Sequence, residues 1–383
     1  MGNRQLLAGI LFAVVGAEVF AVQPGFVQGL VAHGGFTDKQ AGDLAGLEMV
    51  GYASTTILMV FLSRRINWRL LTIFSVAMAV VGNLASTLTS DFWLFGITRV
   101  VVGIGSGGMT AIGFATVSLT SRPDRNFGVM ITTVLVYAAL VMVLMPSIYD
   151  LAGLNGILFV FAAFAAASIP FVRYVPTSGA QQGPIERDAV QLERPWIVTA
   201  LAAMFCYFLA QGVVWAYLFL IGTGDGASEQ SVANGLTLSQ FTGIAGAMTA
   251  AIVGIRFGRL PFLTLGILCA VLPLIAFLIV KQTPFNYLLA VLAYNFGYNL
   301  IHPFLLGTIA SIDKTGRVIF YAVALQESGL AVGPFIAARV IDEGKYDSIS
   351  WLGAVLFVAA WLLIILPVMK HDRVLATEKT VAV

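Results

Sequence analysis

The sequence predicts an all-α polytopic membrane protein with twelve transmembrane helices arranged as two six-helix lobes. Of its 383 residues, 59% are hydrophobic and only 10% are charged, and the mean hydropathy is +0.92. A soluble domain carries roughly 25% charged residues, and its interior is too small relative to its surface to hide so many apolar side chains. The composition therefore excludes a soluble globular domain and intrinsic disorder.

Apolar runs of about 20 residues match the helix length that crosses a hydrocarbon core of about 30 Å. We expect spans near residues 6–30, 41–62, 69–88, 93–118, 128–149, 153–173, 196–221, 236–255, 261–280, 285–310, 318–341 and 351–369. The first run is too long for a signal peptide, contains Glu18 and is followed by eleven further runs. It is therefore expected to remain as a helix.

One segment between the runs is both long and polar, and it divides six runs from six. It reads PTSGAQQGPIERDAVQLE and begins at Pro176. We expect an N-terminal lobe over 1–174, a cytoplasmic linker over 175–195, a C-terminal lobe over 196–370 and a cytoplasmic tail over 371–383. No other loop is long enough for a separate domain, so any activity is expected among the helices.

Lysine and arginine are distributed unevenly between the two sets of loops. With both termini on the cytoplasmic side, that side holds 16 of these residues and the other side holds 3. Cytoplasmic loops of membrane proteins carry such an excess. The bias predicts cytoplasmic termini, in an inner (cytoplasmic) or plasma membrane.

The two halves repeat with an offset of about 192 residues. The matched pairs are Arg64 and Arg256, Gly105 and Gly297, Glu48 and Gln240, and Glu18 and Gln211. Polar residues are rare in membrane spans, so these matches indicate a duplicated lobe rather than similarity between apolar strings. Parallel repeats of this kind place a binding site between the lobes, near the middle of the membrane.

Two motifs extend this pattern to a known family. The fourth run contains Arg99-Val-Val-Val-Gly103-Ile-Gly105, and the loop after the eighth contains Arg256-Phe-Gly-Arg259. Together with the six-plus-six arrangement, these strings resemble the major facilitator superfamily of secondary transporters. The resemblance implies two lobes that alternate the access of a central site. The fifth run has Met145-Pro146 where antiporters of the family have a Gly-Pro motif.

Four charged residues within the runs are candidates for proton coupling, namely Glu18, Glu48, Arg99 and Glu327. An ionised group at mid-bilayer costs at least about 2.5 kcal/mol on insertion scales, so each needs a partner or a water-filled path. Burial favours a protonated carboxyl and a nearby cation favours an ionised one. Arg99 beside an acid could therefore act as a proton switch, or alternatively as a static brace. Arg339 is expected to extend to the membrane interface.

Polar and aromatic residues form stripes on two runs of the second half. The candidate substrate-binding residues are Tyr207, Gln211, Trp215, Asn295, Tyr298, Asn299 and His302. Their spacings, close to one helical turn, place each stripe on one helix face. Side chains of this kind also bond neighbouring helices, which is the alternative role. His302 could instead satisfy the region where Pro303 lacks an N–H.

Further residues are candidates for gating and helix packing. They are Gly103, Gly107, Gly329, Gly333, Pro334, Arg256 and Arg259. Small residues four apart allow helices to approach closely and slide. The two arginines first determine topology, and the family resemblance implies a second role at an inner gate.

The repeat also assigns different roles to the two lobes. Two acids of the first half, Glu18 and Glu48, match two amides of the second, Gln211 and Gln240. Glutamine can donate and accept hydrogen bonds but cannot titrate. We infer that ion coupling is concentrated in the first lobe and solute recognition in the second.

These features predict a secondary active transporter that moves a small organic solute by alternating access. We expect coupling to protons, with sodium as the alternative ion. The alternatives are a proton-driven multidrug-type efflux antiporter and, outside transport, a membrane-embedded lipid-modifying enzyme or a channel. No Walker P-loop, metal-ligand spacing or nucleic-acid-binding basic tract is present. We expect no cofactor, no metal and no nucleic acid, with the solute, protons and membrane lipid as partners of a monomer.

Overall fold

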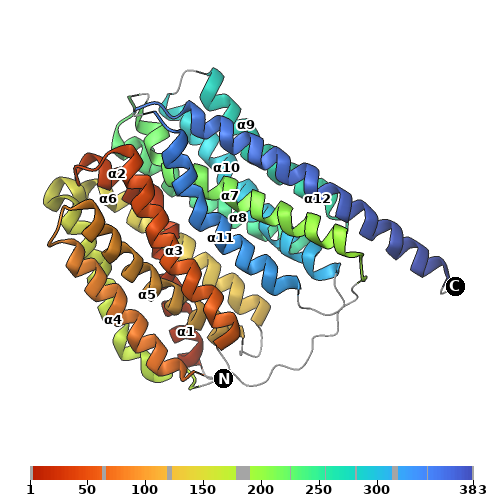
Figure 1. Ribbon diagram of the computed structural model, residues 1–383, viewed down its shortest axis with the longest axis horizontal. Helices are drawn as coiled ribbons and strands as arrows, with labels where there is room; N and C mark the ends of the chain where they lie inside the picture. Colours follow the sequence, from red (N-terminus) through yellow and green to blue (C-terminus); the bar gives the residue numbers. More distant parts are fainter. Residues whose placement is uncertain are drawn as a thin grey trace.

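The computed structural model describes residues 3–62, 66–118, 123–177, 190–224, 226–254, 256–280, 283–312, 318–342 and 344–381. Figure 1 shows two groups of helices side by side, the first coloured red to yellow and the second green to blue. The first group contains α1 (Asn3–Ala21), α2 (Gln23–Ala32), α3 (Asp38–Leu62), α4 (Trp68–Ser86), α5 (Phe92–Ser118), α6 (Pro123–Ala167) and the 3₁₀ helix η1 (Ile169–Tyr174). The second group contains α7 (Arg194–Gly224), α8 (Glu229–Val253), α9 (Leu260–Ile279), α10 (Pro284–Ser311), α11 (Val318–Val340) and α12 (Asp347–Val381).

The helices agree with the twelve predicted spans. Among the described residues, nine stretches are long and apolar enough to cross a bilayer, and one of them, 129–174, is long enough for two passes. Helices α3 and α11 are more polar but contain 25 and 23 residues. At about 1.5 Å per residue, both are long enough to span a hydrocarbon core.

The first pass is divided into α1 and α2 because of Pro24. This proline stands in the first turn of α2, and it has no N–H to donate to the carbonyl one turn back. The carbonyl left without that helical donor belongs to Phe20. It accepts a hydrogen bond of 2.7 Å from Trp215 Nε1 of α7 instead.

The fifth and sixth passes are continuous in α6 except at Gly153. There the backbone has φ 60° and ψ −159°, a conformation that only glycine adopts at low cost. The chain reverses at this point, as predicted from the separation of runs 128–149 and 153–173. Helix η1 then completes the second of these passes.

The bundle has two distinct ends. We name the end with the start of α1, the end of α12 and the linker the terminal end, and the opposite end the loop end. The linker is bound to each lobe: Trp68 N donates to Thr177 O at 3.0 Å, and Val190 N donates to Ser311 O at 2.9 Å. Its residues 178–189 lie outside the described part of the chain.

Several basic loop residues that predict the orientation also lie outside the described residues. They are Arg64, Arg65, Arg122, Arg187, Lys281, Lys314 and Arg317. The cytoplasmic position of the termini therefore stays a prediction.

The duplicated glycines occupy equivalent places in the two lobes. Gly105 of α5 lies against the backbone of α4, where an added Cβ would overlap Ser75 O. Gly297 of α10 lies against α9 in the same way, where a Cβ would stand 2.8 Å from Gly266 O. The two glycines predicted to match therefore lie at equivalent helix contacts, α5 with α4 in the first lobe and α10 with α9 in the second.

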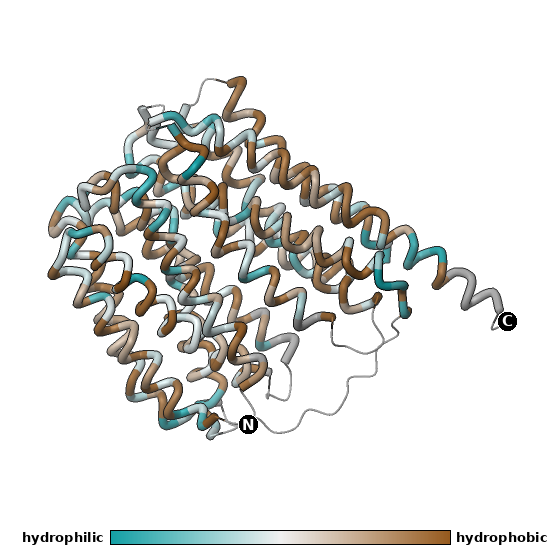
Figure 2. The backbone as a smooth tube through the Cα atoms, in the orientation of Figure 1, coloured by the Kyte–Doolittle hydropathy of each residue, from teal (hydrophilic) through white to brown (hydrophobic). Residues whose placement is uncertain are grey.

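The outer surface is suited to lipid. Large apolar side chains such as Phe61, Phe74 and Leu140 are more than half exposed, and hydrophobic residues run along most of the helices (Figure 2). Without lipid such a surface would be unusually apolar for a monomer. The protein is an integral membrane protein.

Candidate solute cavity

The two lobes are joined at the loop end by hydrogen bonds around Asp38, the first residue of α3. Its Oδ2 accepts bonds from Gly344 N and Tyr346 OH, each at 3.0 Å. Its backbone carbonyl accepts a bond of 2.7 Å from Tyr217 OH of α7. Asp38 is buried, so these bonds connect the lobes in a region largely removed from water.

Further polar pairs join the lobes nearby. Gln28 Nε2 of α2 donates to Glu229 Oε1 of α8 at 3.2 Å, and His33 Nε2 lies 3.8 Å from Glu229 Oε2. Arg339 of α11 pairs with Asp43 of α3. Arg339 was expected to extend to the membrane interface, and its side chain is largely exposed at this end while it pairs with Asp43. Sequence reasoning missed Asp43 because nothing in the spacing relates residues 296 positions apart.

Two adjoining chambers lie between the lobes on the other side of this seal. Their volumes are about 530 and 240 Å³. They share seven lining residues: Ala17, Phe20, Tyr52, Thr110, Phe114, Tyr298 and His302. The larger chamber reaches Met59 of α3 and Val323 of α11, both near the terminal end. The combined space is in the size range of sites for drug-sized molecules.

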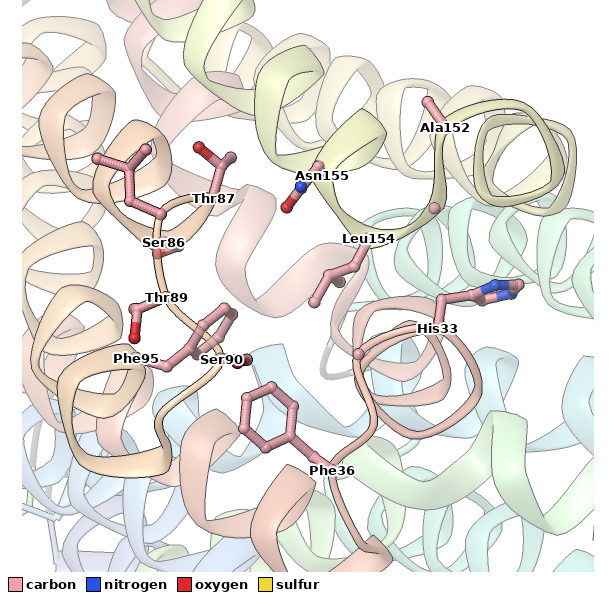
Figure 3. Close-up of a pocket in the computed structure, with 13 residues that line it drawn as sticks. His33, Phe36, Ser86, Thr87, Thr89, Ser90, Phe95, Ala152, Leu154 and Asn155 are labelled. Carbon is pink, nitrogen blue, oxygen red and sulfur yellow. The ribbon is translucent and has the colours of Figure 1, made fainter.

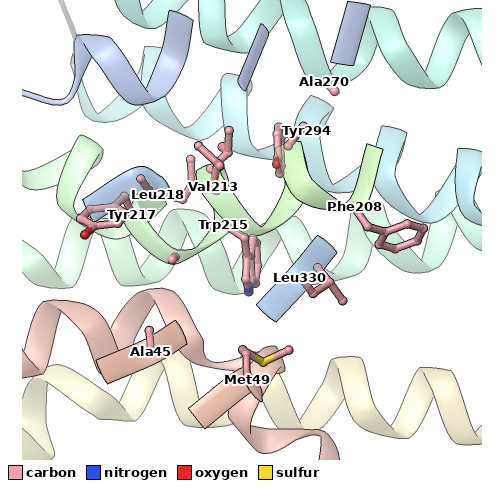
Figure 4. Close-up of a cluster of buried hydrophobic side chains, with 14 of the residues drawn as sticks. Ala45, Met49, Phe208, Val213, Trp215, Tyr217, Leu218, Ala270, Tyr294 and Leu330 are labelled. Atoms are coloured by element: carbon pink, nitrogen blue, oxygen red, sulfur yellow. The ribbon is translucent and has the colours of Figure 1, made fainter. Parts of the chain in front are cut away.

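Six of the seven predicted substrate-binding residues line these chambers. Gln211, Trp215, Asn295 and Asn299 line the smaller chamber, and Tyr298 and His302 line both. Figure 4 shows Trp215 extending from α7 toward the first lobe, with Met49 beyond the tip of its ring and Leu330 to one side. The two stripes therefore face the same space, as their periodicity indicates, and their role in binding stays a prediction.

Tyr207 is the exception in the α7 stripe. Its ring is buried against Phe208 and Phe357, with ring centroids 5.2 and 5.3 Å apart, and it does not line either chamber. The stripe drifts from the cavity because i, i+4 steps advance slightly more than one helical turn. Tyr207 is a packing residue in this conformation.

The amides of the second lobe are held in place by hydrogen bonds. Gln211 Oε1 accepts from Tyr294 OH at 2.8 Å. Asn295 Nδ2 donates to Ser239 Oγ at 3.0 Å, and Asn299 Nδ2 donates to Asn295 Oδ1 at 2.9 Å. Because these bonds use only part of each amide's capacity, the amides can present further donors or acceptors to a solute.

Glu327 of α11 lines the larger chamber and ends a chain of polar groups. His302 Nε2 lies 3.0 Å from Gln326 Oε1, and Gln326 Nε2 donates to Glu327 Oε1 at 3.3 Å. An amide oxygen only accepts, so His302 carries a proton on Nε2 in this arrangement. The second carboxyl oxygen of Glu327, Oε2, is buried without a hydrogen-bond partner among the described residues.

Glu18 is buried within the first lobe and does not line the chambers. Its Oε2 accepts a bond of 3.2 Å from Tyr137 OH of α6, while Ala17 and Ala21 of the same helix do face the cavity. Of the acids available to Arg99 in this half, Glu48 and not Glu18 is its salt-bridge partner. No hydrogen bond or salt bridge joins the described side chains of Glu18 and Arg99.

Arg99 lies at a junction of helices of the first lobe. Its guanidinium lies 3.4 Å from Glu48 Oε1 and donates to Asn83 Oδ1 at 3.2 Å and to Ser86 Oγ. Its Cζ also lies 5.4 Å from the centre of the Phe26 ring. Both Arg99 and Glu48 are buried away from the chambers. Of the two roles considered for Arg99, a proton switch and a static brace, this arrangement suits the brace.

The predicted packing glycines lie at close helix contacts. Gly103 and Gly107 of α5 face the backbone of α3, at Glu48 and Tyr52. Gly329 and Gly333 of α11 face α7, and Gly333 directly precedes Pro334. These contacts bring α3 and α7 close to their partners, and both helices line the cavity or its seal.

The two loop arginines lie at the terminal end, between α8 and α9. Arg256 is exposed, and Arg259 is the residue preceding α9. Burial lowers the pKa of Arg259, and nearby Asp372 opposes this shift. Asp372 belongs to the same lobe, so the described contacts of these arginines do not form a gate between lobes.

A separate cavity of about 430 Å³ lies at the loop end of the first lobe. Its lining includes Thr87, Thr89 and Asn155 (Figure 3), and it shares no lining residue with the two chambers. It is therefore not part of the space between the lobes.

A model of the Major Facilitator Superfamily matches residues 8–334. The chain belongs to this superfamily. An MFS-type transporter of Bacillus subtilis (strain 168), YbcL, is 22% identical over 343 residues, which cover 85% of each protein. The crystal structure of a D-xylose–proton symporter has a TM-score of 0.74 and 16% sequence identity, and the match covers 94% of this chain and 96% of that one. This MFS protein is a membrane transporter and not an enzyme.

Proposed function

We propose that this MFS protein is a secondary active transporter that moves a small organic solute by alternating access, driven by protons. One observation carries the proposal. The lobes are closed together at the loop end around Asp38, while the chambers between them extend toward the terminal end. A site closed on one side and approached from the other suits transport by alternating access.

The orientation completes this proposal. The excess of lysine and arginine at the terminal end supports a cytoplasmic position for both termini, in the inner or plasma membrane. The conformation is then inward-facing, with its seal on the outside.

Among the candidate proton-coupling residues, the geometry favours Glu327. A carrier must exchange protons with water and respond to the solute, and Glu327 lines the cavity. Glu18 has no such exposure in this conformation, and Glu48 is held beside Arg99. We assign proton coupling to Glu327 and bracing to Glu48 and Arg99. This moves coupling from the first lobe, where the acid–amide asymmetry placed it, to the second.

Uptake by the purified full-length protein in liposomes tests the proposal. Solutes are first selected from a panel of small organic molecules by the increase they cause in the melting temperature of the protein. A selected solute should then show saturable uptake that responds to a pH gradient. Ohmic currents without saturation would indicate a channel, and turnover of membrane lipid would indicate an enzyme; either would overturn the proposal.

Two matched variants test the coupling residue. Glu327→Gln should abolish accumulation driven by the pH gradient but retain solute exchange, because glutamine cannot carry the proton. Glu18→Gln removes another buried acid and should retain accumulation. The reverse result would assign coupling to Glu18, as the sequence alone suggested.

A further inference from the structure

The ionisable side chains that line the cavity give it the potential for negative charge. Among the described residues that line the two chambers, Glu327 is the only carboxylate, and none is lysine or arginine. Glu327 is buried, with an exposed fraction of 7%. A carboxylate in such surroundings lacks the hydration it would have in water, and an incoming cation would stabilise it.

The neighbours of Glu327 leave this charge uncompensated. Gln326 donates one hydrogen bond to Oε1, and Oε2 has no partner among the described residues. The titratable groups that face it from other helices are Tyr52 of α3 and Tyr298 and His302 of α10. Neither tyrosine supplies a positive charge. His302 would carry a positive charge only with protons on both ring nitrogens, and its Nε2 forms a hydrogen bond with Gln326 rather than Glu327.

Aromatic rings surround the same space. Phe20 lies with its ring centre 5.9 Å from that of Trp215 and 6.3 Å from that of Tyr298, and all three side chains line the cavity. The bond from Trp215 Nε1 to Phe20 O fixes the indole in place. Aromatic faces attract cations, indole most strongly, and they also receive the apolar body of an amphipathic molecule.

We propose that the chambers bind an organic cation with an apolar or aromatic body, its positive group at Glu327 Oε2 and its body against Phe20, Trp215 and Tyr298. This names the solute class of the transporter and so rests on the proposed function. Gln211 and Asn299, which line the smaller chamber, form hydrogen bonds with a polar substituent of the solute or with water. Anions are disfavoured because no cationic side chain is available to receive them among the described lining residues.

Binding of two ions of matched size and opposite charge tests this assignment. Tetraphenylphosphonium and tetraphenylborate have similar shapes and neither titrates, so the sign of the charge is the main difference. Equilibrium binding of each is measured on the full-length protein in detergent. The cation should bind saturably and the anion at least about tenfold more weakly, as expected for a single charge a few ångströms from the ligand.

Three variants locate the charge. Glu327→Gln should weaken phosphonium binding by about tenfold or more, whereas Glu327→Asp should retain most of it. Glu18→Gln, which removes a buried carboxyl outside the chambers, should leave the affinity within about twofold of the parent value. Thermal unfolding of each variant controls for loss of fold.

The outcomes separate this assignment from the transport proposal. Equal phosphonium affinity in the parent protein and Glu327→Gln would overturn the cation site, as would tighter binding of the borate. Saturable transport of a neutral or anionic solute alone would overturn the cation site and leave secondary transport supported. Phosphonium binding that depends on Glu327 supports the site even where liposome assays show no transport.

Discussion

The loop-end seal should depend strongly on the carboxylate of Asp38. Replacing this residue in Asp38→Ala removes the acceptor of two bonds from the second lobe, those of Gly344 N and Tyr346 OH. A hydrogen bond to a charged group contributes about 1.5–3 kcal/mol. Taking the lower value for both bonds, the closed state loses about 3 kcal/mol relative to an open one. Since about 1.4 kcal/mol corresponds to a factor of ten, the equilibrium should shift about 100-fold toward opening.

The opening can be measured by the reactivity of a cysteine beneath the seal. Ala45 of α3 is fully buried, and Figure 4 shows it pointing toward α7. An Ala45→Cys protein, with the native Cys206 and Cys269 changed to serine, is labelled with a membrane-impermeant maleimide applied from the loop side. While the closed state dominates, the labelling rate follows the open fraction. Asp38→Ala should therefore raise the rate by about 100-fold, or to saturation.

A matched aspartate provides the control. Asp91 also lies at the loop end, but its Oδ1 accepts bonds from Trp93 N and Leu94 N at the start of α5 in its own lobe. Asp91→Ala should therefore leave the labelling rate nearly unchanged. A rise of less than about threefold in Asp38→Ala, where about 100-fold is expected, would refute the proposed seal. An equal rise in Asp91→Ala would have the same consequence.

Three further variants test the packing and the cavity. Gly103→Ala should reduce the free energy of unfolding by about 1–3 kcal/mol, seen as a lower melting temperature, because the added Cβ would overlap Glu48 O. Gly307→Ala is the control, because the nearest atom to its added Cβ is 4.0 Å away. Arg99→Gln should cost about 3–5 kcal/mol by leaving Glu48 buried without its cation, and adding Glu48→Gln should recover part of it; no recovery would argue against the brace. Trp215→Ala should weaken binding of the selected solute without preventing membrane insertion, and an unchanged dissociation constant would remove Trp215 from the site.

The positions of the polar stripes show how far periodicity predicts a site. Gln211 and Trp215 on α7 face the cavity, as do Asn299 and His302 on α10. Their spacing places each set on one helix face, and amides and aromatic rings on a common face within a bundle have few alternatives to the interior. Tyr207 belongs to the same stripe but lies one turn earlier. Because each i, i+4 step advances slightly more than one helical turn, its side chain points away from the cavity and packs against Phe208 and Phe357.

The acids show where this reasoning ends. Glu18 and Glu327 are both buried carboxyls in apolar runs, yet only Glu327 lines the chambers. The rotation of α1 about its axis follows from its contact with α5, where Gly16 lies against Thr110 and Gly113 against Ala13. These contacts join residues about 100 positions apart, so no local pattern reports them.

By itself, the sequence determined that this protein lies in a membrane, that it consists of two related lobes of helices, and which helix faces carry polar groups. Those properties depend on hydrophobicity and helical period, which are local. Only the tertiary structure decided which acid borders the cavity, that Arg99 lies beside Glu48, and that Asp38 joins the two lobes at one end. These are outcomes of close packing between distant segments, because the rotation and separation of two helices are set by the side chains where they meet.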